Sequence, residues 1–200
     1  MFRKISYAAI FIMTFILMGA VTYAGYGYMA KSDRSIMSAP DRAVLVFMRR
    51  YSFGSSNASS VFDVSENETK LVGILYNNET KIMYDVAPGE HTFMVVGESA
   101  DFLKATVLAG KIYYLLVQPR VGFWKDRYSF RPLRQSDLAS PDFSDWDQHM
   151  VLVENTPQSE EWARKNSPDI ERKRARYWPT WNALSLELRE SMTLKPEDGR

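Results

Sequence analysis

Side chains that could perform chemistry are few in this sequence. None of the 200 residues is a cysteine, which excludes thiol nucleophiles, disulfides and thiolate sites for zinc or iron–sulfur clusters. The two histidines, His91 and His149, are far apart in the chain, so a metal site built on several imidazoles is excluded as well. No phosphate-binding loop, nucleophile elbow or metalloprotease helix occurs. These observations predict a protein that is not an enzyme and uses no cofactor.

Carboxylates are the remaining groups with catalytic or metal-binding potential. Residues 137–147 have the composition of a polar loop, and the acids Asp142, Asp145 and Asp147 in it could hold calcium outside the cytoplasm. Their spacing is not that of an EF-hand and the turn glycine is missing, which favours a solvated acidic loop over a metal site. Two carboxylates of a hydrolase could also assemble through space, but no particular pair is indicated.

Aromatic and basic side chains provide the candidate binding residues. Trp124 and Tyr128, on a strand expected at 123–130, could stack on a sugar ring or fill the core. An expected basic helix supplies three candidates for contact with a protein partner or with acidic lipid headgroups, namely Arg172, Arg174 and Arg176. The formal net charge of +1 provides no general attraction to nucleic acid, which is not expected as a partner.

The last third of the chain is expected to be helical. Pro157 and Pro168 follow capping residues and are expected to begin two helices, the second of which ends before Pro179. A final helix then carries an apolar stripe formed by Trp181, Leu184 and Leu188. That stripe would either dock on the rest of the protein or contact another subunit.

The first thirty residues form a separate unit with the properties of an export segment. Arg3 and Lys4 are followed by residues 5–30, which carry no charge. The densest apolar run, at 8–21, suits a cleaved secretory signal, and the whole uncharged stretch also suits a retained transmembrane anchor. Under either interpretation the chain after residue 30 lies outside the cytoplasm, because positive charge stays inside.

The middle of the chain has the pattern of a β domain. Residues 31–42 are polar and interrupted by proline, as in a linker, whereas residues 43–133 contain seven or eight short strands separated by turn residues. Because helical crossovers are absent, we expect an antiparallel β-sandwich over 43–133, followed by the acidic loop and a helical extension at 134–200.

Two stretches carry most of this β prediction. Residues 43–51 are apolar almost throughout, which predicts a central strand. Residues 81–96 alternate in polarity on both sides of Pro88 and Gly89, which suit the central positions of a turn. This second stretch predicts a β-hairpin.

Several short sequence segments of the β region also resemble a known family. The order of A-V-L-V-F-M-R-R-Y-S-F-G-S, V-F-D-V with a following L-V-G-I-L, Y-D-V-A-P-G-E-H-T-F and G-K-I-Y-Y-L resembles a family of bacterial β-sandwich domains of unknown function, often lipoproteins. That family is in turn similar to PEGA-type surface modules. The resemblance implies an exported, immunoglobulin-like or transthyretin-like binding module with no catalytic residues. It departs from the lipoprotein pattern at Ala20, where a lipidated cysteine would stand.

Taken together, the sequence predicts a non-catalytic interaction or scaffold module of the cell envelope, exported or anchored through residues 5–30, with envelope proteins as partners. A carbohydrate-binding module and a carboxylate-dependent hydrolase are the alternatives. Asn57, Asn67 and Asn78 each begin a glycosylation sequon, and each also suits a turn.

Overall fold

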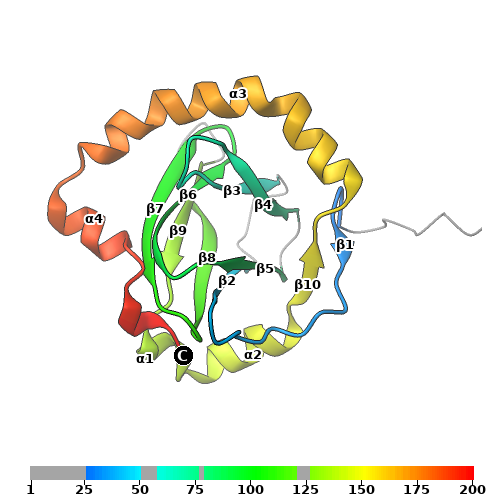
Figure 1. The fold of residues 1–200 in the computed structure, drawn as a ribbon, viewed down its shortest axis with the longest axis vertical. Coiled ribbons are helices and arrows are strands. Elements are labelled where there is room, and N and C mark those ends of the chain that lie inside the picture. The colour runs from blue at the N-terminus through cyan, green and yellow to red at the C-terminus, as the bar shows by residue number, and fades with distance from the viewer. Residues whose placement is uncertain (1–25, 51–57, 77–78, 121–126) are drawn as a thin grey trace, which may run out of the picture.

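A computed structural model describes residues 26–50, 58–76, 79–120 and 127–200. Over these residues the protein is mainly β, with two sheets and a helical C-terminal region (Figure 1). Residues 1–25 of the export segment expected at 1–30, the candidate Trp124 and the sequons at Asn57 and Asn78 lie outside the described residues. No helix within the described ranges is long and apolar enough to cross a bilayer.

The first sheet, called sheet A, has six strands and a mixed topology. In spatial order its strands are β1 (Ala30–Lys31), β10 (Val151–Glu154), β5 (Thr80–Val86), β2 (Ala43–Arg49), β8 (Ile112–Arg120) and β9 (Arg127–Pro132). β2 runs parallel to β8, and β10 runs parallel to β5. The expectation of a purely antiparallel arrangement is therefore wrong. Parallel neighbours need a long connection, and here the second sheet and the helices provide it in place of a single helical crossover.

The second sheet, called sheet B, has four strands, all antiparallel. Their spatial order is β4 (Lys70–Leu75), β3 (Ser59–Asp63), β6 (Gly89–Val96) and β7 (Ala100–Val107). A bulge between Val61 and Phe62 shifts the register of β3 against β4. Gly73 lies opposite Val61 with a φ of 159°, and a Cβ atom there would come within 2.7 Å of Ile82 Cδ1.

The predicted hairpin at 81–96 is wrong, although both of its strands exist. β5 bonds to β2 and β10 in sheet A, whereas β6 bonds to β3 and β7 in sheet B. Pro88 and Gly89, the latter with a φ of 129°, therefore form a corner at which the chain changes sheets. Instead of a backbone ladder, ring contacts such as Tyr84 on Phe93 join the two strands, with centroids 6.2 Å apart. Alternation identifies strands, but it does not identify their partners.

The main core lies between the two sheets. Phe47 of sheet A meets Phe93 of sheet B edge to face, with ring centroids 5.2 Å apart. The outer face of sheet A is buried as well, since Val44, Val46 and Met48 pack with Phe143 in a second cluster. The apolar run of β2 therefore has both faces covered, which confirms it as a central strand.

Residues 26–30, the last part of the stretch expected to be an export segment, also reach this core. Met29 is fully buried, and its Sδ accepts a hydrogen bond from the Ile74 amide at 3.4 Å. Ala30 and Lys31 then pair with β10 as a short edge strand. The β domain thus includes residues directly C-terminal to residue 25.

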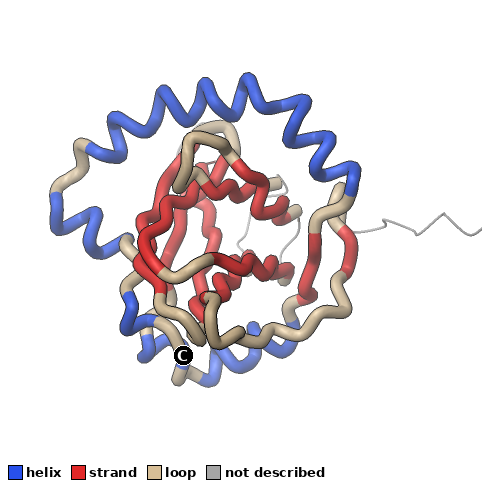
Figure 2. The backbone as a smooth tube through the Cα atoms, in the orientation of Figure 1, coloured by secondary structure: helices blue, strands red, loops and turns tan. Residues whose placement is uncertain are grey.

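Residues 134–200 surround the two sheets and are here called the belt (Figures 1 and 2). Apart from β10, the belt consists of α1 (Gln135–Leu138), α2 (Pro141–His149), α3 (Pro157–Asn182), α4 (Leu186–Met192) and the 3₁₀ turn η2 (Pro196–Asp198). α2 covers the outer face of sheet A and α3 covers that of sheet B. The acidic loop expected at 137–147 is therefore wrong. Ser140 caps α2 by accepting from the Phe143 amide, and Phe143 is buried.

α3 is one helix and not two. It continues through Pro168 and Pro179, which were expected to begin and end a separate helix. Both prolines lie on the exposed side. Water can therefore solvate the carbonyls that lose their intrahelical partners, and the helix curves around the sheet (Figure 1). The expected three-residue stripe is consequently divided, because α3 ends at Asn182 and Leu188 belongs to α4.

The two ends of the belt bond to each other. The Arg134 guanidinium donates to the carbonyls of Ser191 at 2.8 Å and Thr193 at 3.0 Å, and also to the buried carboxylate of Asp198. The Gln135 amide donates to the Gly199 carbonyl at 3.0 Å. These bonds close the belt into a ring.

The last residues of the belt also join sheet A. Arg200 and Ile112 exchange two backbone hydrogen bonds of 3.0 and 3.1 Å, and the Arg200 guanidinium reaches Asp147 of α2 at 3.3 Å. Gly199 lies against the ring of Tyr113, where an added Cβ would be 2.6 Å from Cζ. Only glycine fits this close approach without displacing the ring.

Replacing Arg134 with alanine should open the belt. The substitution removes three bonds and leaves the Asp198 carboxylate, whose side chain is 5% exposed, without its cation. We expect the free energy of unfolding to fall by about 2–4 kcal/mol, measured by urea denaturation. The matched variant Arg131→Ala breaks a more exposed pair with Asp137 and should cost less than about 1 kcal/mol. Equal costs for the two variants would show that the closure does not stabilise the fold.

Candidate functional site

α3 is the longest helix of the described chain. One of its faces packs on sheet B, and the opposite face is exposed to solvent. Its inner face is mostly aromatic: Phe102 of β7 contacts Trp178 at 5.0 Å between centroids, and Trp178 stacks on Trp181 at 5.4 Å. Its outer face is charged with both signs and consists of Glu160, Glu161, Arg164, Lys165, Glu171, Arg172 and Arg176. The aromatic contacts therefore hold the helix while the charged groups stay available to a partner.

Two basic side chains of α3 face inward and are occupied within the molecule. Arg174 donates to the carbonyls of Val64 and Glu66 at 3.3 Å each and to Thr69 Oγ1 at 3.1 Å. Lys173 Nζ donates to the Gly97 carbonyl at 2.8 Å. Arg174, predicted as a partner contact, thus fastens the helix to the connection between β3 and β4.

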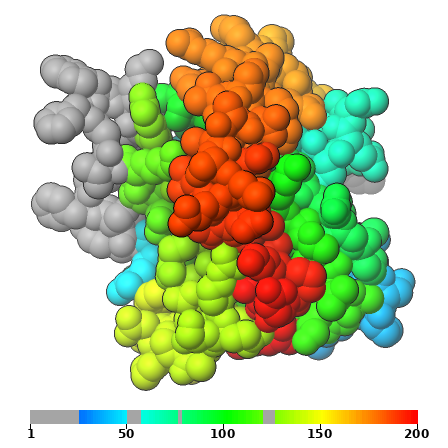
Figure 3. Space-filling model, turned by 90° about the vertical axis from the view of Figure 1, so that its left-hand side faces the viewer, coloured from blue at the N-terminus to red at the C-terminus, as the bar shows by residue number. Residues whose placement is uncertain are grey.

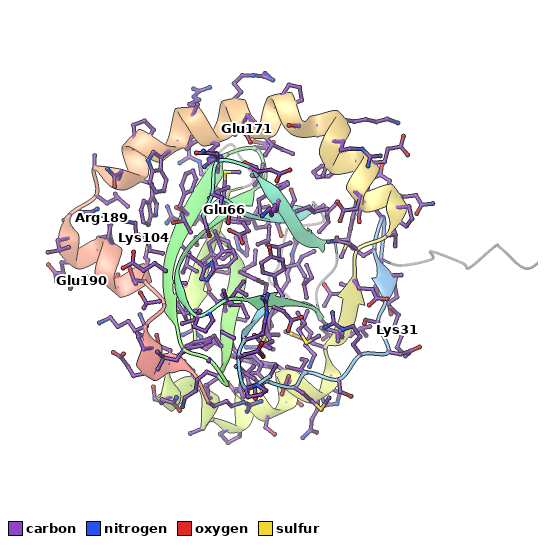
Figure 4. The ribbon with its side chains drawn as sticks, viewed as in Figure 1. Lys31, Glu66, Lys104, Glu171, Arg189 and Glu190 are labelled. Carbon is purple, nitrogen blue, oxygen red and sulfur yellow. The ribbon has the colours of Figure 1, made fainter. Side chains whose placement is uncertain are left out.

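A groove of about 720 Å³ lies between α3 and that connection. Its floor includes the apolar side chains of Phe62, Leu71 and Ile170. Charged and polar groups form the rim, namely Asn67, Glu68, Thr69, Lys70, Glu160, Arg164, Ser167 and Glu171. Figure 4 labels Glu171 on the helix and Glu66 on the connection. The groove combines an apolar floor with a rim of both charge signs.

Tyr84 contributes a neutral hydroxyl to the groove. Burial, with the neighbouring Asp63 carboxylate, raises the pKa of Tyr84 above its ordinary value. Its hydroxyl donates to Asp63 Oδ2 at 3.2 Å. The phenol therefore stays protonated and acts as a donor, not as a base.

A second pocket, of about 190 Å³, lies at the C-terminal end of α3 and is here called the end pocket. Its lining residues are Ser99, Ala100, Asp101, Arg120, Arg127, Tyr128, Tyr177, Thr180, Trp181 and Leu184. Three candidates from the sequence, Tyr128, Trp181 and Leu184, meet here. In Figure 3 the end of α3 and α4, drawn in orange and red-orange, cross this side of the molecule beside the green strands.

Tyr128 is a buried wall of the end pocket. Its side chain is 2% exposed, the Arg49 guanidinium lies over its ring at 5.0 Å, and Arg49 also donates to its hydroxyl at 3.1 Å. A ring packed in this way has little free surface for stacking on a sugar. The other proposed sugar contact, Trp124, lies outside the described residues.

The charged groups of the end pocket come from three strands. Arg120 of β8 and Arg127 of β9 are opposite each other in the ladder, and Arg120 donates to Asp101 of β7 at 3.0 Å. Burial raises the pKa of Asp101, and the Arg120 cation and a backbone amide oppose this shift only in part. Sequence reasoning missed all three residues. Arg127 lies inside the strand expected at 123–130, and no sequence spacing linked it to Asp101 or Arg120.

The other predicted residues are dispersed. Arg172 pairs with Asp169 on the exposed surface at 3.3 Å, the Arg176 guanidinium lies 5.6 Å from the centre of the Tyr177 ring, and Leu188 is 46% exposed on α4. No contact joins these three side chains to one another among the described interactions.

The three acids proposed for calcium also separate. Asp147 pairs with Lys81 of β5 at 2.7 Å, whereas Asp145 pairs with His149 on the exposed side of α2 at 3.1 Å. Asp142 lies in the first turn of the helix. Within the part of the chain that the structure describes, no three ligating side chains are grouped so as to hold a metal ion.

Both edges of sheet B are covered by the belt. Leu194 pairs with β7, where its amide donates to the Lys104 carbonyl and its carbonyl accepts from the Thr106 amide, each at 2.9 Å. At the opposite edge the Asn155 side chain donates to the Val72 carbonyl of β4 at 3.2 Å. An added strand from a partner would have to displace these contacts.

Comparison with known proteins leaves the function to be argued from this geometry. No family model matches the chain. No curated protein matches it at a significant level.

The raised pKa of Asp101 predicts a pH dependence of stability. Because the folded state binds this proton more tightly than the unfolded state, Asp101 destabilises the fold most when it is ionised, near pH 7. As the pH falls toward about 4, the ordinary value for aspartate, wild type should gain stability relative to Asp101→Asn. Urea denaturation of both proteins between these pH values measures the difference. A constant or opposite difference would contradict the assignment.

Proposed function

We propose that the protein is a non-catalytic interaction module of the cell envelope that binds its partner through the outer face of α3. The observation that carries this proposal is the division of the helix: its aromatic face is fixed on sheet B, and its other face presents charged side chains beside an apolar-floored groove. Charged surfaces of mixed sign provide specificity through complementarity with a partner. A helix held in place in advance also loses little conformational entropy on binding.

The distribution of the carboxylates supports recognition over hydrolysis. Asp147 holds Lys81 and Arg200, Asp198 holds Arg134, and Asp101 holds Arg120. A carboxylate hydrolase needs two acids that converge on one bond. The most buried acids of the described chain, Asp101 and Asp198, are instead paired with cations in separate places.

The fold assignment is part of the same proposal. We assign residues 43–133 to the immunoglobulin-like or transthyretin-like sandwiches that the sequence resembles, supported by two sheets that face each other across one core. The parallel pairs β2–β8 and β5–β10 make sheet A a mixed variant of that architecture. The resemblance to this class implies a binding module without catalytic residues.

The uncharged N-terminal stretch supports a location at a membrane in this proposal. Residues 5–30 carry no charge and follow Arg3 and Lys4, which supports an orientation with the β domain outside the cytoplasm. Because Met29 and the strand at Ala30 belong to the β domain, the part of 5–30 that could serve as a retained anchor ends before Met29, and such an anchor would hold the domain close to the bilayer surface. The outer face of α3 is then available to another envelope protein.

Charge reversal on α3 tests the proposed surface. In cross-linking on intact membranes, the double variant Arg164→Glu/Arg172→Glu should reduce the yield of the cross-linked partner at least tenfold relative to wild type, because both cations lie on the exposed face. The control variant Lys104→Glu/Lys195→Glu changes the same number of charges on β7 and near η2, and its yield should equal that of wild type. Equal losses in both variants, or no specific adduct with wild type, would refute the proposal.

Intact mass tests the location. We expect the protein in the membrane or exported fraction, with either the full mass of an anchored chain or the mass of a chain cleaved after Ala24. The first result identifies an anchor and the second a cleaved signal. Full-length protein confined to the cytoplasmic fraction would contradict the proposed localisation.

A further inference from the structure

Four aromatic side chains gather where the N-terminal stretch meets the β domain. They are Tyr26, Tyr28, Tyr76 and Trp162, here called the aromatic cluster. The Tyr28 ring meets the Tyr76 ring edge to face at 5.9 Å between centroids and lies 6.5 Å from the Trp162 ring. Tyr28 is 42% exposed, while the other three are partly buried against the main core. The cluster therefore has a base that packs on the domain and one exposed ring.

The backbone that carries Tyr28 is fastened to the domain. The Thr156 hydroxyl donates to the Tyr28 carbonyl at 2.6 Å, and the next residue, Met29, is fully buried. On the other side of Tyr28, Gly27 has a φ of 61°, and a Cβ atom there would lie 2.5 Å from the Tyr76 ring. Only glycine allows the backbone to lie so close to that ring. The fold of the domain thus fixes the position of Tyr28.

The uncharged stretch before the cluster limits the distance between Tyr28 and a bilayer. Residues 5–25 carry no charge, and a spanning helix needs about 20 predominantly apolar residues. From residue 25 to Tyr28 an extended chain reaches at most about 11 Å. Each headgroup layer of a bilayer is about 5–8 Å thick. An anchor that ends at residue 25 therefore brings Tyr28 into the headgroup layer or directly beside it.

The chemistry of the aromatic cluster suits this layer. Tyrosine and tryptophan combine an apolar ring with a polar hydroxyl or N–H group, and both are enriched where hydrocarbon meets water. Burial, with the neighbouring Tyr28, raises the pKa of Tyr76 to about 12, so this phenol is uncharged near pH 7. The part of α3 that carries Trp162 also carries the exposed acids Glu160 and Glu161. These acids favour zwitterionic headgroups over anionic ones.

We propose that the aromatic cluster contacts the zwitterionic headgroup layer of the bilayer that anchors the chain, and that this contact fixes the orientation of the β domain. The inference rests on the retained-anchor form of the proposed function and adds a second point of attachment to the membrane. Tyr28 inserts its ring among the headgroups, and the rest of the cluster supports it. α3 then begins at the bilayer and extends away from it, because its 26 residues measure about 39 Å along the helix.

A spin label beside the cluster measures this contact. Because the chain contains no cysteine, Lys31→Cys provides a single labelling site on β1, and Lys104→Cys provides one on the opposite side of the molecule (Figure 4). Full-length protein is reconstituted into phosphatidylcholine vesicles. Collisions of the label with oxygen, which concentrates in lipid, are compared with collisions with a water-soluble nickel complex. We expect the oxygen-to-nickel ratio to be about threefold or more higher at position 31 than at position 104.

Substitutions of Tyr28 distinguish the aromatic contact from the effect of the anchor. In the Lys31→Cys protein, Tyr28→Ser should lower the ratio about threefold or more, because the anchor remains but the interfacial ring is lost. Tyr28→Trp keeps an interfacial ring and should preserve the ratio. The matched control Leu186→Ser removes an apolar side chain that is 65% exposed on α4 and should also leave the ratio unchanged.

The outcomes separate this inference from the proposed function. Equal ratios at positions 31 and 104, a ratio that Tyr28→Ser leaves unchanged, or equal losses with Tyr28→Ser and Tyr28→Trp would overturn the aromatic contact alone. The membrane location and the outer face of α3 would stand. Full-length protein that does not integrate into the vesicles would overturn both the aromatic contact and the proposed anchoring.

Discussion

The closure of the belt is the constraint on which the outer layers depend. The belt contributes one short strand, β10, to the sheets, so its helices are held by packing on the outer sheet faces and by the bonds at its two ends. Arg134 joins the two ends, because one guanidinium satisfies two carbonyls and a buried carboxylate from the far end. Its loss would release α4 and the Leu194 pairing that covers the edge of β7. The closure of the belt therefore contributes to covering the edges of sheet B and to holding α3 and the end pocket in position.

Curvature lets α3 follow the sheet it covers. A straight helix of 26 residues would diverge from a twisted four-stranded sheet, whereas α3 keeps aromatic contact from Trp162 to Trp181. Pro168 and Pro179 allow the bend at points where the freed carbonyls meet water. The same geometry leaves the charged face outermost and creates the groove on one side and the end pocket at its C-terminal end.

The candidate sites were only partly accessible to sequence reasoning. Tyr128, Trp181 and Leu184 stand out as aromatic or apolar residues, and all three line the end pocket, but as walls and helix-packing groups. Its polar groups, Asp101 and the two arginines, lie on three strands whose pairing is a tertiary property. No spacing along the chain brings an aspartate of β7 to an arginine of β8.

The sequence by itself determined the mainly β character, the positions of most strands and the buried course of β2, because alternation and apolarity are local properties of the chain. Tertiary structure alone decided that β5 and β6 belong to different sheets and that β2 lies parallel to β8, since many pairings satisfy the same alternation and only the complete core selects one. It also decided that residues 137–147 form helices and that α3 continues through two prolines. In both cases burial of Phe143, Ile170 and Trp181 outweighs the local preference for a loop or a helix end.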